Sequence, residues 1–295
     1  MKHLVIISGK GGTGKTSVTA SLAALAGSCV LADCDVDAAD LHLLLDPQVQ
    51  RREDFFGSQL ARIDPDRCTD CGRCAELCRF DAINDRPHQI DPLACEGCGL
   101  CAWACPAGAI EMFDSVNGRW MLSQTRLGPM VHAALTPGAD NSGKLVHTVK
   151  TQAIELAQAR QADWLLVDGA PGTGCPVIAS IAAADLVLIV TEPTRSGLHD
   201  MQRVAELAKH FSIPAAVCIN KADINPQIAD EITTSATDRN LPVLARIDYD
   251  PAVTAAQRAG LSIVEFGTAP AADQVRSLWS RLQETFASRQ QTDLS

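Results

Sequence analysis

The stretch HLVIISGKGGTGKT occupies residues 3–16 and joins a short apolar run to a glycine-rich loop. The loop ends in Gly14-Lys15-Thr16 and fits the pattern G-x4-G-K-[ST], which requires a strand before it and a helix after it. Glycines let backbone N–H groups approach phosphate oxygens, and the start of the following helix favours negative charge. Lys15 would neutralise the β- and γ-phosphates, and the Thr16 hydroxyl would bind Mg²⁺. We therefore predict a nucleotide site made by Gly11, Gly12, Thr13, Gly14, Lys15, Thr16 and Ser17.

Most of the remaining chain alternates short apolar runs with helical patterns. This rhythm predicts an α/β fold with a mostly parallel, doubly wound sheet and helices on both faces. Strands are expected at His3–Ser8, Cys29–Asp33, Trp164–Asp168, Leu186–Thr191, Ala215–Asn220 and Val243–Ile247. Helices are expected at Lys15–Ala26, Lys144–Arg160, Pro176–Ala183, Leu198–His210, Gln227–Thr234, Pro251–Ala259 and about Ala271–Ser288. The last of these contains apolar residues at helical spacing and is expected to pack on the core.

The composition narrows the class of protein. The 295 residues include 25 Lys and Arg against 35 Asp and Glu, a net charge of −10, so we expect no broad basic surface for nucleic acid. The first apolar run is too short for a signal peptide, and no run approaches the roughly 18 apolar residues of a membrane span. We expect a cytoplasmic protein without stable membrane insertion, whose twelve cysteines are reduced or bound to metal.

Eight of the twelve cysteines lie between residues 60 and 114, where helical and strand patterns are weak. They form two copies of C-x2-C-x2-C-x3-C, and every cysteine of the first copy recurs 27 residues later. This spacing is typical of proteins that bind [4Fe–4S] clusters, whereas zinc, the alternative, usually takes thiolates from two separated C-x2-C pairs. We predict a small iron–sulfur domain at residues 60–114, inserted into an α/β domain of residues 1–59 and 115–295. Val116–Arg119 is expected to form a hairpin turn that leads back to the sheet.

The inserted segment resembles the bacterial-type ferredoxins with two [4Fe–4S] clusters, which are small α+β domains. One departure is Arg79, which stands where the pattern has proline after the fourth cysteine. In such ferredoxins the fourth cysteine of each run ligates the other cluster. The resemblance therefore implies one cluster on Cys68, Cys71, Cys74 and Cys105 and a second on Cys95, Cys98, Cys101 and Cys78.

The phosphate loop also contains Lys10, and in the form K-G-G-x-G-K-T it resembles the deviant Walker A loop of the MinD/ParA/nitrogenase iron protein superfamily. In that superfamily the extra lysine reaches the partner's phosphates across a dimer. The resemblance thus implies an ATP-dependent homodimer in which Lys10 and Lys15 are catalytic. Asp35, after the second predicted strand, is similar to the first-switch carboxylate near the attacking water and Mg²⁺. Asp168 resembles the Walker B carboxylate of the Mg²⁺ shell.

Two further positions carry open alternatives. Asn220-Lys221-Ala222-Asp223 matches the guanine-reading N-K-x-D motif of GTPases, but in MinD-like proteins an Asn at this place faces adenine. Because Lys10 favours the MinD-like family, we predict that Asn220 binds the adenine of ATP. Cys175 lies where the nitrogenase iron protein has a cluster ligand, so the two Cys175 residues of a dimer could hold metal; a buried, structural cysteine is the alternative.

These observations predict a slow ATPase whose nucleotide-switched dimer gates iron–sulfur chemistry. It would assemble or deliver a metallocluster, or pass electrons, to an acceptor or donor metalloprotein. The alternative is a spatial organiser like MinD or ParA, with the ferredoxin segment as a structural or redox-sensing addition. That alternative predicts ATP-stimulated binding to lipid or DNA.

Overall fold

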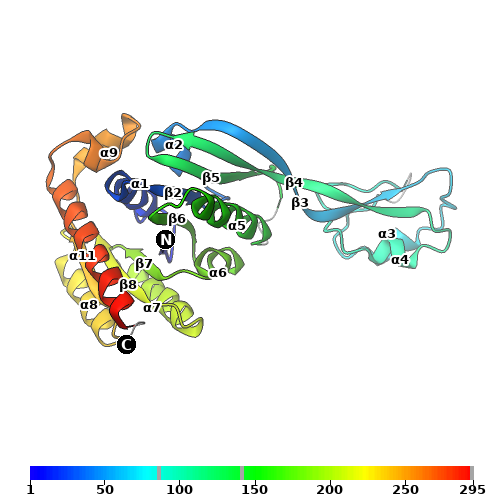
Figure 1. The fold of residues 1–295 in the computed structure, drawn as a ribbon. Coiled ribbons are helices and arrows are strands. Elements are labelled where there is room, and N and C mark those ends of the chain that lie inside the picture. The colour runs from blue at the N-terminus through cyan, green and yellow to red at the C-terminus, as the bar shows by residue number, and fades with distance from the viewer. Residues whose placement is uncertain (85–87, 140–142, 293–295) are drawn as a thin grey trace. The chain divides into compact units, whose positions relative to one another are not determined.

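The computed structural model describes residues 1–84, 88–139 and 143–292, with side chains described as far as residue 289. The chain divides into two compact units (Figure 1). The first unit comprises Met1–Arg52, Trp120–Ala134 and Asn141–Ser295, and the second unit comprises Glu53–Arg119 and Leu135–Asp140.

The described residues form one nine-stranded sheet in the order β3-β4-β5-β2-β6-β1-β7-β8-β9. The strands are β1 (Lys2–Ser8), β2 (Cys29–Asp33), β3 (Gln48–Ile63), β4 (Ile110–Thr125), β5 (Gly128–Leu135), β6 (Trp164–Pro171), β7 (Leu186–Thr191), β8 (Ala215–Asn220) and β9 (Val243–Ile247). The helices are α1 (Lys15–Ala26), α2 (Leu41–Leu45), α3 (Arg73–Leu77), α4 (Leu100–Ala104), α5 (Lys144–Ala159), α6 (Cys175–Ile181), α7 (Arg195–His210), α8 (Pro226–Thr237), α9 (Pro251–Arg258), α10 (Ile263–Phe266) and α11 (Pro270–Thr292).

The strands of the first unit's core pair in parallel, which confirms the predicted α/β fold. β1 lies between β6 and β7, and β2 lies on the other side of β6. Asp168 of β6 pairs in register with Ile6 of β1 and with Asp33 of β2. Because parallel strands end at the same edge, this register gathers the residues that follow β1, β2 and β6 at one place.

Two groups of helices cover the sheet of the first unit (Figure 1). α1, α10 and α11 contact one another, whereas α5 packs on α6 and α7 packs on α8. The predicted terminal helix does pack on the core: Trp279 of α11 lies tilted against Trp164 of β6 and Phe286 meets the same ring edge to face, with ring centroids 4.6 and 5.0 Å away. No helix among the described residues has the length and hydropathy that a bilayer crossing requires.

The second unit repeats its backbone at the same interval as its cysteines. α3 and α4 are related by the 27-residue shift, and each follows a glycine in the left-handed conformation, Gly72 (φ 77°) and Gly99 (φ 74°). Cys78 and Cys105 come directly after these two helices. Glycine is the residue that adopts this conformation without strain, so the two loops can turn tightly before each helix.

The predicted hairpin turn at Val116–Arg119 is wrong, because these residues lie inside β4. Asn117 explains the difference: its Oδ1 accepts hydrogen bonds from the backbone N–H groups of Gly57 and Ser58, both at 2.9 Å, and so supports β3 from within the strand pair. The turn lies instead at Arg126 and Leu127, between β4 and β5. The second unit therefore extends further along β3 and β4 than the predicted range 60–114.

A buried histidine of the first unit predicts pH-dependent stability. His132 on β5 lies with its Nε2 2.8 Å from Ser123 Oγ on β4, and burial lowers the pKa of His132 to about 4. An unfolded histidine titrates near pH 6.5. Between pH 6.5 and pH 4 the unfolded state therefore binds a proton that the folded state does not, and the free energy of unfolding falls as the pH falls.

In the variant His132→Gln, the free energy of unfolding should fall by up to about 3 kcal/mol less than in the natural protein between pH 6.5 and pH 4. Urea titrations of both proteins between pH 7 and pH 4.5 measure the difference. Parallel pH dependences for the variant and the natural protein would contradict the assignment.

Candidate functional site

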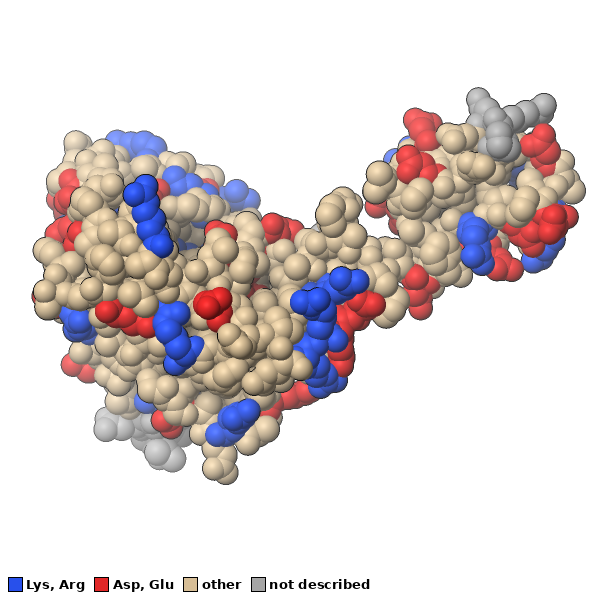
Figure 2. All heavy atoms as spheres, turned by 90° about the horizontal axis from the view of Figure 1, so that it is seen from above, with Lys and Arg blue, Asp and Glu red and all other residues tan. Residues whose placement is uncertain are grey.

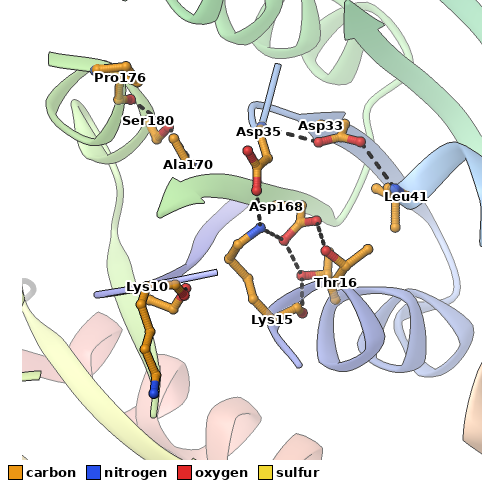
Figure 3. A network of polar contacts seen from close by, with 12 residues as sticks. Lys10, Lys15, Thr16, Asp33, Asp35, Leu41, Asp168, Ala170, Pro176 and Ser180 are labelled. Carbon is orange, nitrogen blue, oxygen red and sulfur yellow. Dashed lines mark hydrogen bonds and ion pairs between the residues drawn. The ribbon is translucent and has the colours of Figure 1, made fainter. Parts of the chain in front are cut away.

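Charged side chains from three separate elements meet at the carboxyl ends of β2 and β6 (Figure 3). The ammonium Nζ of Lys15, the first residue of α1, lies 2.9 Å from Asp168 Oδ1 and 3.3 Å from Asp35 Oδ2. The hydroxyls of Thr16 and Thr19 donate to the two oxygens of Asp168, at 2.7 and 3.2 Å. The structure thus brings together the four residues predicted for phosphate and Mg²⁺ binding, and it adds Thr19.

Burial makes these charges depend on one another. Lys15 is 5% exposed and Asp168 is fully buried. Burial opposes the charge of Lys15, but the carboxylates of Asp168 and Asp35 raise the pKa of Lys15 above its usual value. Burial raises the pKa of Asp35, and Lys15 partly offsets that effect. The ammonium group is therefore the counter-ion that keeps these carboxylates stable in the buried site.

Asp33 belongs to this site although sequence reasoning did not select it. Its carboxylate accepts backbone hydrogen bonds from Asp35 and from Leu41, both at 3.2 Å, and so shapes the segment between β2 and α2. Burial, followed by the charge of Asp168, raises the pKa of Asp33 well above its usual value. The sequence did contain a feature that indicates Asp33: it is the last residue of a predicted buried strand and lies two residues before Asp35.

Lys10 does not join this group, and its side chain points away from it in Figure 3. Its Nζ lies 3.4 Å from Thr194 Oγ1, 3.2 Å from Ser196 Oγ and 3.7 Å from Glu192 Oε2, and its side chain is 33% exposed. Glu192 also pairs with Lys221 at 2.5 Å. Lys10 is thus held by a small set of partially exposed polar groups from which it can be withdrawn at low cost.

The loop and Asn220 border a cavity of about 250 Å³. Asn220 Nδ2 donates to the carbonyl of Thr13 at 2.8 Å. Gly14 has a left-handed backbone conformation (φ 89°), and a Cβ atom there would lie 2.3 Å from that same nitrogen, so this position favours glycine. Asp223 accepts a hydrogen bond from the backbone N–H of Tyr249 at 2.6 Å, which engages one of its carboxylate oxygens. The cavity is lined by Gly12, Gly14, Ser17, Asn220, Lys221, Tyr249 and Gln257, among others.

The eight cysteines of the second unit line two separate cavities. The first cysteine cavity is bordered by Cys68, Cys71, Cys74 and Cys105. The second cysteine cavity is bordered by Cys78, Cys95, Cys98 and Cys101. All twelve cysteines of the chain have free thiols. Within the described ranges, no three His, Cys, Asp or Glu side chains converge closely enough to hold a single metal ion.

The other four cysteines lie in the first unit. Cys29, Cys34 and Cys218 are buried in or beside strands, and burial raises the pKa of each thiol, to about 11, 12 and 12. They pack as small apolar side chains. Cys175 is exposed at the start of α6, so the buried alternative for this residue is wrong. Its predicted role as a metal ligand between two protomers stays a prediction.

Comparisons with known proteins agree with this geometry. Residues 4–263 match the model of the family described as the CobQ/CobB/MinD/ParA nucleotide binding domain. An uncharacterized protein of Methanocaldococcus jannaschii is 35% identical over 226 residues, which are 75% of this chain and 79% of that protein.

Solved structures show the same fold. The cell division ATPase MinD of Pyrococcus furiosus is similar with a TM-score of 0.58 and 20% identity, over 96% of this chain and 99% of that chain. The septum site-determining protein MinD of Pyrococcus horikoshii, solved with Mg-ADP, is similar with a TM-score of 0.58 and 19% identity, over 95% of both chains.

Loss of the buried cation should destabilise the protein. Lys15→Met leaves the carboxylates of Asp35 and Asp168 without their counter-ion, which is expected to lower the free energy of unfolding by about 3–5 kcal/mol at pH 8. The loss should be smaller at pH 5, because proton uptake neutralises the carboxylates. Urea titration at the two pH values measures it.

Lys10→Met is the matched control, because its partially exposed ion pair is expected to contribute only about 0–1 kcal/mol. Equal losses of stability in the two variants would contradict the role of Lys15 as the internal counter-ion.

Proposed function

This chain belongs to the family of CobQ/CobB/MinD/ParA nucleotide-binding domains, and from that premise we propose that it is a slow ATPase whose nucleotide state switches its conformation. The observation that carries the proposal is the buried contact of Lys15 with Asp168 and Asp35, with the Thr16 hydroxyl on the same carboxylate. Phosphoryl transfer depends mainly on positioning and charge neutralisation, and these groups supply both.

The donor set of this site fits Mg²⁺. Thr16, Asp35 and Asp168 present hydroxyl and carboxylate oxygens at one place, and oxygen is the ligand that Mg²⁺ prefers. Bound with ATP, Mg²⁺ neutralises charge on the phosphates. We assign Thr16 and Asp168 to its shell, Asp35 to the shell and the attacking water, and Lys15 to the β- and γ-phosphates. The cavity beside Asn220 would receive the adenine.

The position of Lys10 supports a nucleotide-dependent homodimer. Its ammonium group is partly exposed, and among the described residues its partners are Thr194, Ser196 and Glu192, so it can exchange these partners for phosphate oxygens of a second protomer. Closure of such a dimer around ATP and its reopening after hydrolysis would form a two-state switch.

Lys10→Ala should abolish ATP turnover without unfolding the protein, whereas Lys15→Ala should prevent nucleotide binding. Because a dimer is required, phosphate release per chain should rise with protein concentration in the natural protein. Lys209→Ala, which removes an exposed lysine at the end of α7, serves as the control. Normal turnover in the Lys10 variant, or a rate per chain independent of concentration, would argue against the dimeric mechanism.

We further propose that the second unit binds two [4Fe–4S] clusters, one in each cysteine cavity. Each cavity is lined by four free thiols, three from one copy of the repeat and one from the other copy. A [4Fe–4S] cluster takes one thiolate at each of its four iron atoms, so its ligands stand further apart than those of a single ion. The four free thiols of each cavity match the four iron atoms of one such cluster.

Anaerobic purification should yield a brown protein that contains iron and absorbs near 400 nm. Cys105→Ser should lose up to about half of the iron, because it removes a ligand from one cavity only. Cys218→Ala removes a thiol buried in β8 and should retain all of the iron. Zinc without iron in the natural protein, or full iron in a Cys105→Ser, Cys78→Ser double variant, would refute the cluster assignment.

A second candidate function follows from the structural likeness to MinD, a cell division ATPase. In this alternative the chain is a spatial organiser, and its second unit is structural or senses redox state. The net charge of −10 does not favour an anionic lipid or DNA partner. On the face seen in Figure 2, Lys and Arg side chains are interspersed with Asp and Glu. ATP-stimulated binding to anionic vesicles or to DNA would support this alternative over the first proposal.

The combination of a nucleotide switch with cluster sites supports a function in which this chain acts on another metalloprotein. Either the clusters would be assembled and delivered, or their electrons would be passed on, under control of the nucleotide state. Cluster loss to an apo-acceptor on addition of ATP would indicate delivery. Retained clusters with ATP-dependent reduction of a partner would indicate electron transfer.

A further inference from the structure

The two cysteine cavities have corresponding walls. Nearly every residue that lines the first cysteine cavity has a counterpart 27 positions away in the wall of the second. Several of these pairs are identical, namely Ile63 with Ile90, Gly72 with Gly99, Ala109 with Ala82, and Ile110 with Ile83. Since the shared residues give both cavities a common framework, a chemical difference between the sites comes from the pairs that differ and from the residues that line only the second cavity.

Four pairs differ in polarity or charge. Each pair gives the residue of the first cavity and then that of the second: His88 with Ala61, Thr69 with Glu96, Arg73 with Leu100, and Pro106 with Arg79. The side chains of Arg73, Glu96 and Arg79 are exposed, so water and salt screen their charges. The side chain of His88 is only 5% exposed. His88 against Ala61 is therefore the difference that acts at low dielectric and carries the most weight.

His88 is a largely buried polar group in the wall of the first cavity. Its Nδ1 lies 2.9 Å from the carbonyl oxygen of Asn84 and donates to it. Its Nε2 is buried and lies 3.1 Å from Oδ1 of Asp70, whose side chain is 55% exposed. The backbone N–H of Ala109 also donates to Cys105 Sγ at 3.3 Å at this cavity. In contrast, the second cavity has apolar Leu77 and Phe80 in its wall, and their counterparts do not line the first cavity.

Reduction of a cluster adds one electron and therefore negative charge. Buried polar groups, and N–H groups that donate hydrogen bonds to sulfur, stabilise that added charge and raise the reduction potential of the cluster. An apolar wall does not have this effect. Resting on the proposed cluster function, we propose that the two sites have unequal reduction potentials and that His88 makes the first cysteine cavity the higher-potential site. An electron from a one-electron donor would then be held first at Cys68, Cys71, Cys74 and Cys105.

The test is an anaerobic redox titration of the full chain, followed by electron paramagnetic resonance, with iron content measured in the same samples. The natural protein should show two separate one-electron steps. His88→Ala, which installs the counterpart residue Ala61, should shift the higher step to lower potential and leave the other unchanged. His88→Gln keeps an N–H donor and should therefore shift the higher step less than His88→Ala does. If the alanine variant loses a cluster, the comparison of the glutamine variant with the natural protein serves as the test.

Arg73→Leu is the matched control, because it also installs the counterpart residue, Leu100, but at an exposed position. It should leave both potentials close to those of the natural protein. One shared potential in the natural protein, unchanged steps in both His88 variants, or an equally large shift in the Arg73 variant would overturn the proposal. An iron-free natural protein would instead refute the cluster function on which the proposal rests.

Discussion

The ion pairs of Lys15 with Asp168 and Asp35 are the contact on which the nucleotide half of the molecule depends. A buried ammonium group and buried carboxylates are stable only together, and here each comes from a different part of the chain. The phosphate loop after β1, the segment after β2 and the end of β6 must therefore assemble in one register. The parallel order β2-β6-β1 near the middle of the sheet brings these three segments together.

The segment after Asp35 connects this site to the second unit through the chain itself. Asp33 accepts a hydrogen bond from Leu41 at the start of α2, and Arg126 donates to the carbonyl of Leu44 near the end of that helix. Arg126 is in turn held by two contacts with Glu265, at 2.7 and 2.9 Å. β3 begins directly after α2 and continues into the second unit. The chain that follows Asp35 therefore runs through α2 into β3, the strand that continues into the second unit.

The sequence predicted the parts of the molecule that depend on local chemistry. The phosphate loop, the buried strands and the 27-residue cysteine repeat each have a pattern that a single stretch of chain displays. β3 was not predicted because most of its residues are exposed and it lacks an apolar face. The hairpin turn predicted at Val116–Arg119 was wrong because the side chain of Asn117 accepts a hydrogen bond from the backbone of β3 instead of stabilising a turn in its own segment. Asp33 and His88 were missed because their importance arises from burial beside partners distant in sequence.

The central claim is that the nucleotide site controls the cysteine-bound clusters. Its most direct test is an anaerobic redox titration of the cluster absorbance, run on the full chain with Mg-ATP and, separately, with Mg-ADP. The account predicts two titration curves that differ in midpoint or in the amount of cluster retained. Superimposable curves from a protein that binds both nucleotides and a full complement of iron would contradict it.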